Sequence, residues 1–340
     1  MLETIYIVRH GYRSNWTVDP KTGTYATAVP TPTGIPSDPA LASYGVAQSE
    51  QLATHLLSLD PAPEILVSSP YYRCLQTLAP YVTHLATPSD PKDPASASPV
   101  SVTVEPGIGE FYGRARFTHP GPASLEVLST HFDHLRAEGE PIIVPAPYGE
   151  SIPMLHDRVA YCLTRLIARA DADPNGPKAI LLCTHAAAII AMGRVLTGRM
   201  PEEVGEEDFG CFTCGLSTFK RRGTVRPAGG VEASAATASD GLVAKWDPAQ
   251  PDEVPDVGWR GGKGVRGGWE CVGDSDCSFL DGGEERGWHF HMEAERIVHE
   301  QAKADAEAAA IPLPETPPTD TKAPATAADH DGSSPAKPKR

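Results

Sequence analysis

The sequence predicts an α/β protein, a three-layer sandwich in which helices cover both faces of a mostly parallel sheet. Two observations carry this prediction. Short β-branched and aliphatic runs alternate with longer segments of helical apolar spacing, and hydrophobic residues make up 40% of the 340 residues. A chain of this length and apolar content can bury one large core. We also expect a small β-rich C-terminal region and a disordered tail.

The first half of the chain shows the alternation most clearly. Residues 5–8 form a short β-rich run typical of a buried parallel strand. Later segments either repeat apolar residues at helical spacing or end in Pro, Gly and Ser. In order, we expect a strand at 5–8, a Pro/Thr/Gly-rich loop at 17–40, a helix at 44–58, a strand within 64–70, a helix at 71–85 and a low-complexity linker at 87–100.

The second half continues this pattern and then changes character near residue 207. The expected elements are an alternating strand within 101–112, an irregular stretch at 113–150, a helix at 152–170, a strand, turn and helix within 178–198, a strand at 211–222, a loop at 223–241, short β segments at 242–247, 267–273, 277–283 and 287–292, a helix at 293–310 and a disordered tail at 311–340. We therefore expect one domain at 1–206, a β-rich region at 207–292 and a helix with a tail at 293–340.

Charge and cysteine content narrow the classes of function. The formal net charge is −15 and the isoelectric point is near 5.2, which argues against broad binding to nucleic acid, and we expect no direct sequence-specific binding either. No apolar stretch reaches membrane-spanning length, and the first residues do not resemble a signal peptide. The seven cysteines are scattered, which favours a reduced compartment, nuclear or cytoplasmic.

Four of the cysteines raise the question of zinc. Cys211 and Cys214 are close in sequence, and Cys271 and Cys277 form a wider pair. Zinc ribbons prefer two tight pairs on turns, and the first pair here is expected on a strand, where the two side chains point to opposite faces. We therefore expect no metal site, and no cofactor.

Polar side chains follow three of the predicted strands. Arg9, His10 and Arg13 follow the first strand, Arg73 follows the second, and His185 follows the strand near residue 180. Because ligand sites in open α/β sheets form at the carboxyl ends of strands, we expect these side chains to converge. A fourth junction, in the stretch VEPGIGEFYGR, would add Glu110.

This set of side chains suits phosphoryl transfer. Arginine binds phosphate oxygens bidentately and stays charged, and an unprotonated histidine is a nucleophile. A second histidine can donate to the phosphoryl oxygens, and a carboxylic acid can protonate the leaving oxygen. The alternatives are ordinary ones: strand-end ion pairs for Arg9 and Arg13, and hydrogen-bonded core positions for His10 and His185. Together the matched junctions make these alternatives the weaker interpretation.

The motifs resemble the histidine phosphatase superfamily, also called phosphoglycerate-mutase-like. They are RHG after the first strand, SSPYYRCLQT after the second, an acidic residue in the middle and LLCTHAAAI, over residues 5 to about 195. The resemblance implies that His10 is the nucleophile, that Arg9, Arg13 and Arg73 bind phosphate, and that His185 assists at the phosphoryl oxygens. It implies Glu110 as the acid/base, with Glu105 and Glu150 as competing carboxylates.

Arg13 favours a hydrolase, because mutases of this family usually carry a small hydroxyl residue there.

RHGYRSNW, SPYYRCLQT and GIGEFY also resemble the histidine-phosphatase subunits of fungal general transcription factor IIIC, which serves RNA polymerase III. That resemblance implies a larger protein partner, bound through residues 207–292, beside a phosphorylated substrate. If the chain is only an enzyme, deletion of 207–340 should leave turnover intact; if it is a subunit, the deletion should abolish partner recovery.

Overall fold

The computed structural model describes residues 1–88, 100–136, 139–223 and 243–291. Met1–Glu293 form one compact unit, and the second unit, Ala294–Arg340, lies outside the described residues. The linker and loop expected near 87–100 and 223–241 lie largely outside them too, as do the helix expected at 293–310 and the tail.

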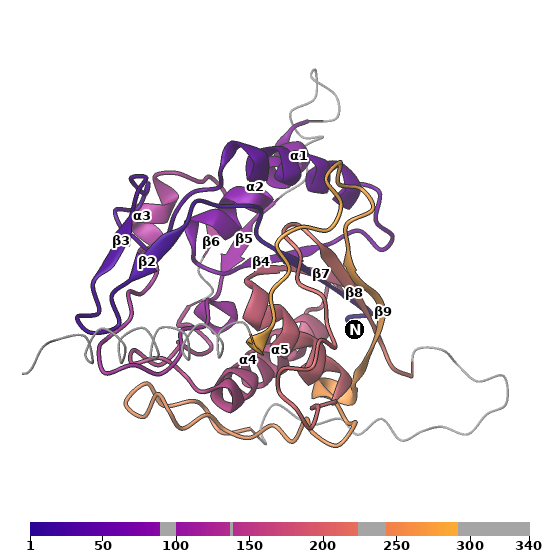
Figure 1. Ribbon diagram of the computed structural model, residues 1–340. Helices are drawn as coiled ribbons and strands as arrows, with labels where there is room; N and C mark the ends of the chain where they lie inside the picture. Colours follow the sequence, from indigo (N-terminus) through magenta and orange to yellow (C-terminus); the bar gives the residue numbers. More distant parts are fainter. Residues whose placement is uncertain (89–99, 137–138, 224–242, 292–340) are drawn as a thin grey trace, which may run out of the picture. The chain divides into compact units, whose positions relative to one another are not determined.

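A seven-stranded sheet runs through the unit in the order β6-β5-β4-β7-β1-β8-β9 (Figure 1). Pairing is parallel from β6 to β1 and antiparallel at β8 and β9. The strands are β1 Thr4–Arg9, β4 Ile65–Ser68, β5 Val102–Val104, β6 Leu135–Arg136, β7 Ala179–Thr184, β8 Leu216–Arg221 and β9 Trp269–Asp276. A separate hairpin pairs β2 Trp16–Val18 with β3 Tyr25–Thr27.

Helices cover both faces of this sheet. They are α1 Ser43–Leu56, α2 Tyr72–Ala86, α3 Leu125–Ser129, α4 Ile152–Ala172 and α5 Ala186–Thr197, with 3₁₀ turns η2 Pro106–Ile108 and η3 Val265–Gly267. Figure 1 shows α1 and α2 on one side and α4 and α5 on the other.

Strand β1 shows why both faces are covered. Ile5 and Ile7 pack with residues of α4 and α5, whereas Tyr6 and Val8 pack with residues of α1 and α2. Because side chains alternate across a strand, an unbroken apolar run supplies both cores. The predicted three-layer α/β sandwich with a mostly parallel sheet is confirmed.

Local signals account for the start of α4. Ser151 accepts a hydrogen bond from the Met154 amide at the start of α4, and Pro153 lies in the first turn, where no donor is needed. Such a cap contributes about 1 kcal/mol. The helices predicted at 44–58, 71–85 and 152–170 are confirmed as α1, α2 and α4.

Other predictions were wrong. The stretch 113–150 is not wholly irregular, because it contains α3 and β6, and the loop at 17–40 contains β3 and the end of β2. The strand expected at 211–222 is only β8, so Cys211 and Cys214 lie in the loop before it. The described residues of three expected short strands, at 242–247, 277–283 and 287–292, form no strand.

Aromatic packing explains the missing strands. Trp246 and Phe290 are buried in the same core as α4 and α5. Apolar residues in these segments therefore anchor loops onto existing helices instead of pairing with one another. The described part of 207–292 contributes β8 and β9 to the main sheet, and β8 pairs directly with β1.

Candidate active site

Three neighbouring strands end at the candidate site. β4, β7 and β1 are adjacent and parallel, so their carboxyl ends meet at one edge. Arg9 ends β1 and His10 follows it, Ser69 follows β4, and His185 follows β7. The ring centroids of His10 and His185 lie 5.3 Å apart. The convergence expected from the strand-end rule is present.

His10 is buried and neutral. Its Nδ1 lies 2.9 Å from the Gly11 carbonyl oxygen, and because a carbonyl only accepts, Nδ1 carries the hydrogen and Nε2 keeps its lone pair. Burial lowers the pKa of His10 well below its usual value, and the nearby Arg73 and His185 lower it further. Gly11 allows the chain after His10 to pass close to α1, since a Cβ there would lie 2.8 Å from the Gly45 carbonyl oxygen.

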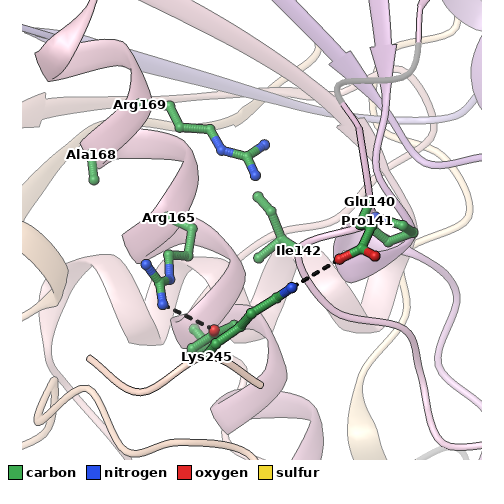
Figure 2. Close-up of a pocket in the computed structure, with 8 residues that line it drawn as sticks. Glu140, Pro141, Ile142, Arg165, Ala168, Arg169 and Lys245 are labelled. Atoms are coloured by element: carbon green, nitrogen blue, oxygen red, sulfur yellow. Dashed lines mark hydrogen bonds and ion pairs between the residues drawn. The ribbon is translucent and has the colours of Figure 1, made fainter. Parts of the chain in front are cut away.

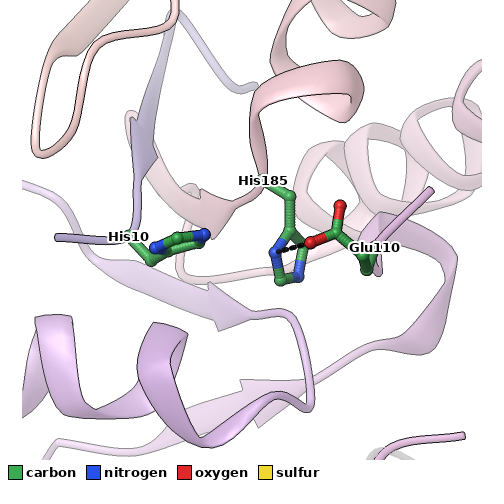
Figure 3. Close-up of side chains that lie close together, drawn as sticks. All are labelled: His10, Glu110 and His185. Carbon is green, nitrogen blue, oxygen red and sulfur yellow. Dashed lines mark ion pairs between the residues drawn. The ribbon is translucent and has the colours of Figure 1, made fainter. Parts of the chain in front are cut away.

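His185 is fully buried and held on both sides. Its Nε2 lies 2.7 Å from the Ser69 hydroxyl, and its Nδ1 lies 3.2 Å from Glu110 Oε2 (Figure 3). Burial alone would lower the pKa of His185, but the negative charges of the Cys74 thiolate and the Glu110 carboxylate together outweigh burial and raise the pKa. His185 is therefore the histidine of the pair that more readily carries a proton.

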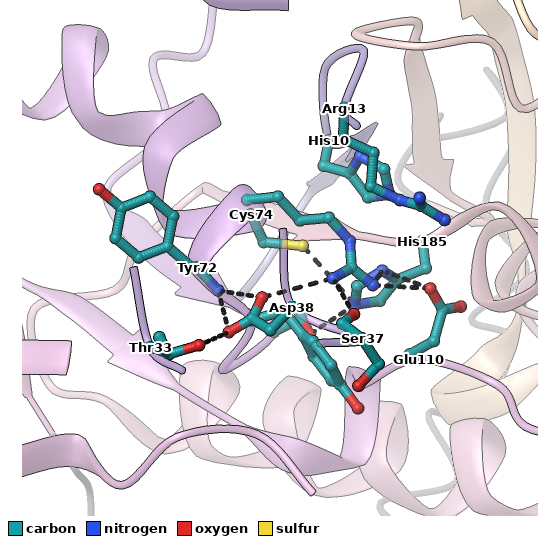
Figure 4. Close-up of polar contacts among 12 residues, drawn as sticks. His10, Arg13, Thr33, Ser37, Asp38, Tyr72, Cys74, Glu110 and His185 are labelled. Carbon is teal, nitrogen blue, oxygen red and sulfur yellow. Dashed lines mark hydrogen bonds and ion pairs between the residues drawn. The ribbon is translucent and has the colours of Figure 1, made fainter. Parts of the chain in front are cut away.

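Arg73 contacts Asp38, Glu110 and His185, and Figure 4 shows how these three partners lie. This fully buried guanidinium donates to Glu110 Oε2 at 2.8 Å and to the Ser37 carbonyl at 3.1 Å, and it lies 3.4 Å from Asp38 Oδ1. Burial is the largest single influence and would lower its pKa, but Glu110, Cys74 and Asp38 together outweigh burial and raise it. Its Nε is buried without a partner in the described part of the chain.

Arg9 and Arg13 add further positive charge. Arg9 Nη1 donates to the carbonyls of Cys211 at 2.6 Å and Arg286 at 2.5 Å, and its buried Nε has no partner among the described residues. Arg13 donates to the Ser14 carbonyl at 2.9 Å. Burial, and then the charge of Arg73, lowers the pKa of Arg13 to about 10, so it remains a cation at neutral pH.

The three competing carboxylates occupy different places. Glu110 lies beside Arg73 and His185, which outweigh the effect of its burial and hold its pKa well below the usual value. Glu105 accepts from the amides of Gly107 at 2.8 Å and of Ile142 at 3.1 Å, so it supports the backbone around η2. Glu150 pairs with buried Arg158 at 2.7 Å.

Some residues of the site carried no sequence signal. Asp38 is fully buried beside Arg73 and accepts from the Tyr72 amide at 2.9 and 3.1 Å, at the start of α2. It comes from a loop without periodicity, so sequence spacing could not find it. The Cys211 and Arg286 carbonyls come from the opposite end of the chain, and a backbone acceptor leaves no mark in sequence.

An aromatic cluster lies next to the site. Trp16 and Tyr25 come from the β2–β3 hairpin, with ring centroids 5.3 Å apart. Tyr112 lies 6.1 Å from Trp16 and stacks on His119 at 4.8 Å. The Arg13 guanidinium lies 5.9 Å from the Trp16 ring centroid, which connects this cluster to the cationic group.

The histidines and Glu110 also offer donors that suit a metal ion. One ligand atom each from His10, Glu110 and His185 lies within 4.8 Å of the others. Imidazole and carboxylate suit zinc. However, the charges of Arg73, Arg9 and Arg13 act on His10, and they would repel a dication. The site favours an anion.

A separate cavity of about 420 Å³ lies beside α4 (Figure 2). It is lined by Glu140, Pro141, Ile142, Tyr161, Arg165, Ala168, Arg169 and Lys245. Lys245 pairs with Glu140 at 2.8 Å, and Arg165 donates to the Val243 carbonyl at 3.0 Å. None of the predicted site residues lines it.

Among the described residues, no helix has the length and apolar character needed to cross a membrane.

Comparison with known proteins supports both resemblances drawn from the sequence. A sequence model of the histidine phosphatase superfamily (branch 1) matches residues 5–226. The transcription factor tau 55 kDa subunit of Saccharomyces cerevisiae is 38% identical over 200 residues, which are 58% of this chain and 42% of that protein. The chain thus spans less than half the length of this relative.

Two solved structures show weaker likeness. The ecdysone phosphate phosphatase from Bombix mori has 17% identity and a TM-score of 0.47, covering 64% of this chain and 89% of that one. The alpha-ribazole phosphatase from Shigella flexneri has 16% identity and a TM-score of 0.39, covering 65% and 91%. The fold assignment rests on the strand order of this chain.

Proposed function

Because the chain belongs to the histidine phosphatase superfamily, we propose that it hydrolyses phosphate monoesters through a phosphohistidine at His10. In the first step Nε2 of His10 attacks phosphorus, a P–N bond forms and the P–O bond to the leaving group breaks. Glu110 gives its proton to the leaving oxygen. Water then attacks phosphorus and gives a proton to Glu110, the P–N bond breaks, and inorganic phosphate leaves.

The cations have distinct parts in this proposal. Arg9, Arg13 and Arg73 neutralise the phosphate dianion, and His185 donates to the phosphoryl oxygens as charge builds on them. Glu110 must hold a proton to act as an acid. A phosphate dianion bound beside Glu110 disfavours a second negative charge there, so we expect substrate binding to raise the pKa of Glu110 from the low value that it has without phosphate.

One observation carries the proposal. A neutral, buried His10 lies among arginines, and two of these, Arg9 and Arg73, keep a buried Nε–H without a partner in the described chain. Buried donors are normally satisfied, so unpaired ones point to an absent acceptor. A phosphate group offers several acceptor oxygens and a negative charge that Arg9, Arg13 and Arg73 can balance. The aromatic cluster beside Arg13 supports an aryl phosphate or a phosphoprotein side chain as substrate.

Release of phosphate from a generic aryl phosphate tests the proposal. Wild-type protein and His10→Ala are compared, each with and without a metal chelator. Turnover by the wild type that is lost in His10→Ala is the expected result. Equal turnover by both proteins would overturn the role of His10, and loss of wild-type activity on chelation would overturn a metal-free mechanism.

The likeness to the transcription factor subunit supports a second function. We propose that the chain is a subunit of a transcription factor IIIC assembly in the nucleus, joined to a larger protein through residues 207–292. Both functions can reside in one chain, because the candidate site keeps its ionisable groups.

Affinity purification of the full-length chain from its own cells tests the subunit proposal. We expect other subunits of the transcription factor to co-purify in stoichiometric amounts, and the chain to be found in nuclei. A monomeric chain without such partners would contradict it. Deletion of 207–340 cannot separate the two functions, because it removes β8, which pairs with β1 beside His10.

A further inference from the structure

A C-terminal segment lies against the candidate site although it falls outside the residues that match the family. We call residues 279–288 the covering segment; it follows β9 and runs over α1 (Figure 1, orange to yellow). Phe279 stacks on His55 of α1 with ring centroids 4.2 Å apart. The Asp281 carboxylate accepts from Gln51 at 2.6 Å, and the Asp281 amide donates to Gln51 at 3.1 Å.

The far end of the covering segment reaches Arg9. The Arg286 carbonyl accepts from Arg9 Nη1 at 2.5 Å, next to the Cys211 carbonyl at 2.6 Å. The neighbouring Glu285 carbonyl accepts from the Thr213 amide at 3.1 Å. Two backbone carbonyls thus occupy one end of a guanidinium that the proposed function assigns to phosphate.

The side chain of Arg286 contacts Tyr12, in the loop that follows His10. Its guanidinium lies 4.9 Å from the Tyr12 ring centroid and 3.5 Å from the Tyr12 hydroxyl. The Tyr12 amide donates to Gln48, which in turn donates to Thr213, each at 3.0 Å. The loop between His10 and Arg13 is therefore bounded by α1, by the turn before β8 and by the covering segment.

The backbone of Arg286 is unusual in a way that matters for Arg9. Its φ is 56°, in the left-handed region that non-glycine residues seldom adopt. A residue in this region turns the chain sharply, and the direction of its carbonyl depends on that turn. Such conformations persist where surrounding contacts hold them.

We propose that the covering segment is a positioning element for the phosphate pocket, in which the Arg286 carbonyl orients Arg9. A guanidinium has a fixed planar fork of donors. With Nη1 held by the two carbonyls, Nε and Nη2 form the edge that remains for phosphoryl oxygens, and Nε is the buried donor without a partner among the described residues. This inference deepens the proposed phosphatase function and rests on it.

The proposal links the two parts of the chain. Any change that moves the covering segment alters phosphate affinity, and by linkage phosphate binding stabilises the segment on α1. A protein that docks on residues 207–292 could therefore tune the phosphate pocket without touching substrate.

Two substitutions at one position separate the carbonyl from the side chain. Arg286→Gly keeps a positive φ and removes the guanidinium. Arg286→Pro fixes φ near −65°, so the carbonyl must turn away from Arg9. The matched control is Arg266→Pro, because Arg266 also has a positive φ, 51°, and its carbonyl accepts from Arg221 at 3.1 Å, outside the candidate site.

The readouts are the Kd for inorganic phosphate by calorimetry, and KM and kcat for an aryl phosphate, with melting temperatures alongside. We expect Arg286→Pro to weaken phosphate binding about tenfold and to raise KM similarly, with kcat changed less than about threefold. Arg286→Gly should change the Kd for phosphate by less than about fivefold, because it removes only one exposed cation–π contact. Arg266→Pro should change the melting temperature without changing Kd.

A second variant covers the case in which Arg286→Pro does not fold. Phe279→Ala with Asp281→Ala detaches the other end of the covering segment and should weaken phosphate binding at least about threefold. Unchanged Kd in folded Arg286→Pro, or in the double variant if the proline variant is unfolded, overturns the positioning role alone. Absence of phosphate binding by the wild type overturns the phosphatase proposal, and this inference with it.

Discussion

Replacement of Glu110 by glutamine is predicted to tighten phosphate binding while slowing turnover. Glu110 Oε2 lies 2.8 Å from Arg73 Nη2 and 3.2 Å from His185 Nδ1. A phosphoryl group that uses the same donors must displace this carboxylate first. Glu110 is thus an internal competitor of the phosphate as well as the proposed acid.

The size of the competition follows from these contacts. A charge-assisted hydrogen bond contributes about 1.5–3 kcal/mol and a neutral one about 1 kcal/mol. The Glu110 side chain is only 15% exposed, so solvent screening is limited. Glutamine keeps a neutral acceptor, so the free energy of phosphate binding becomes more favourable by about 0.5–2 kcal/mol, which corresponds to about two- to thirtyfold tighter binding.

Turnover changes in the opposite direction. Glutamine cannot give a proton to the leaving oxygen, and loss of a general acid costs about 10²- to 10⁴-fold in kcat. The loss should be largest for alkyl phosphates and smaller for aryl phosphates, whose leaving anions are more stable.

The assay measures the inhibition constant of inorganic phosphate, and kcat for one alkyl and one aryl ester. The matched control is Glu105→Gln, because Glu105 is buried on backbone amides around η2 and should affect the unfolding free energy more than phosphate binding. Unchanged or weaker phosphate binding in Glu110→Gln would refute the competition, and equal loss of kcat for both esters would refute the acid role.

Three further predictions follow from the site. The pKa of His10 is lowered, so His10 stays unprotonated and kcat/KM should remain constant to pH values below the usual histidine pKa. The pKa of His185 is raised, so kcat/KM should fall at higher pH, as His185 loses its proton. A pH–rate profile checks this, and an alkaline limb that persists in His185→Gln would contradict it. Glu150→Ala leaves the buried Arg158 guanidinium without its carboxylate partner. Denaturant titration should show the unfolding free energy lowered by about 3–5 kcal/mol; a loss below about 1 kcal/mol would mean that another group compensates the charge. Trp16→Ala should raise KM for aryl more than for alkyl phosphates, because the aromatic cluster is proposed to contact the aryl group; equal changes would remove it from substrate selection.

Strand ends were the part of the site that sequence could predict. His10, Arg73 and His185 follow apolar runs that are long enough to recognise, and the parallel arrangement of those runs brings their ends together. The sequence favoured Glu110 without excluding Glu105 and Glu150, because the contacts that separate the three are long-range. Glu110 lies beside Arg73 and His185, Glu105 accepts from backbone amides, and Glu150 pairs with Arg158.

Local sequence patterns could not predict contacts between loops that are far apart in the sequence. Asp38 comes from a loop without apolar period, and the Arg286 carbonyl meets Arg9 across most of the chain. The aromatic segments after residue 242 resembled strands by composition. Trp246 and Phe290 are instead buried in the core formed with α4 and α5, since burial of large rings outweighed strand pairing.

Trapping of the covalent intermediate tests the phosphohistidine most directly. The wild-type protein is mixed with an aryl phosphate, quenched at alkaline pH and digested, and the phosphorylated peptide is identified by mass spectrometry. We predict phosphate on His10, formed and lost at rates compatible with turnover, and no labelled peptide in His10→Ala. Phosphate on another residue, or turnover without a phosphoenzyme, would contradict the mechanism.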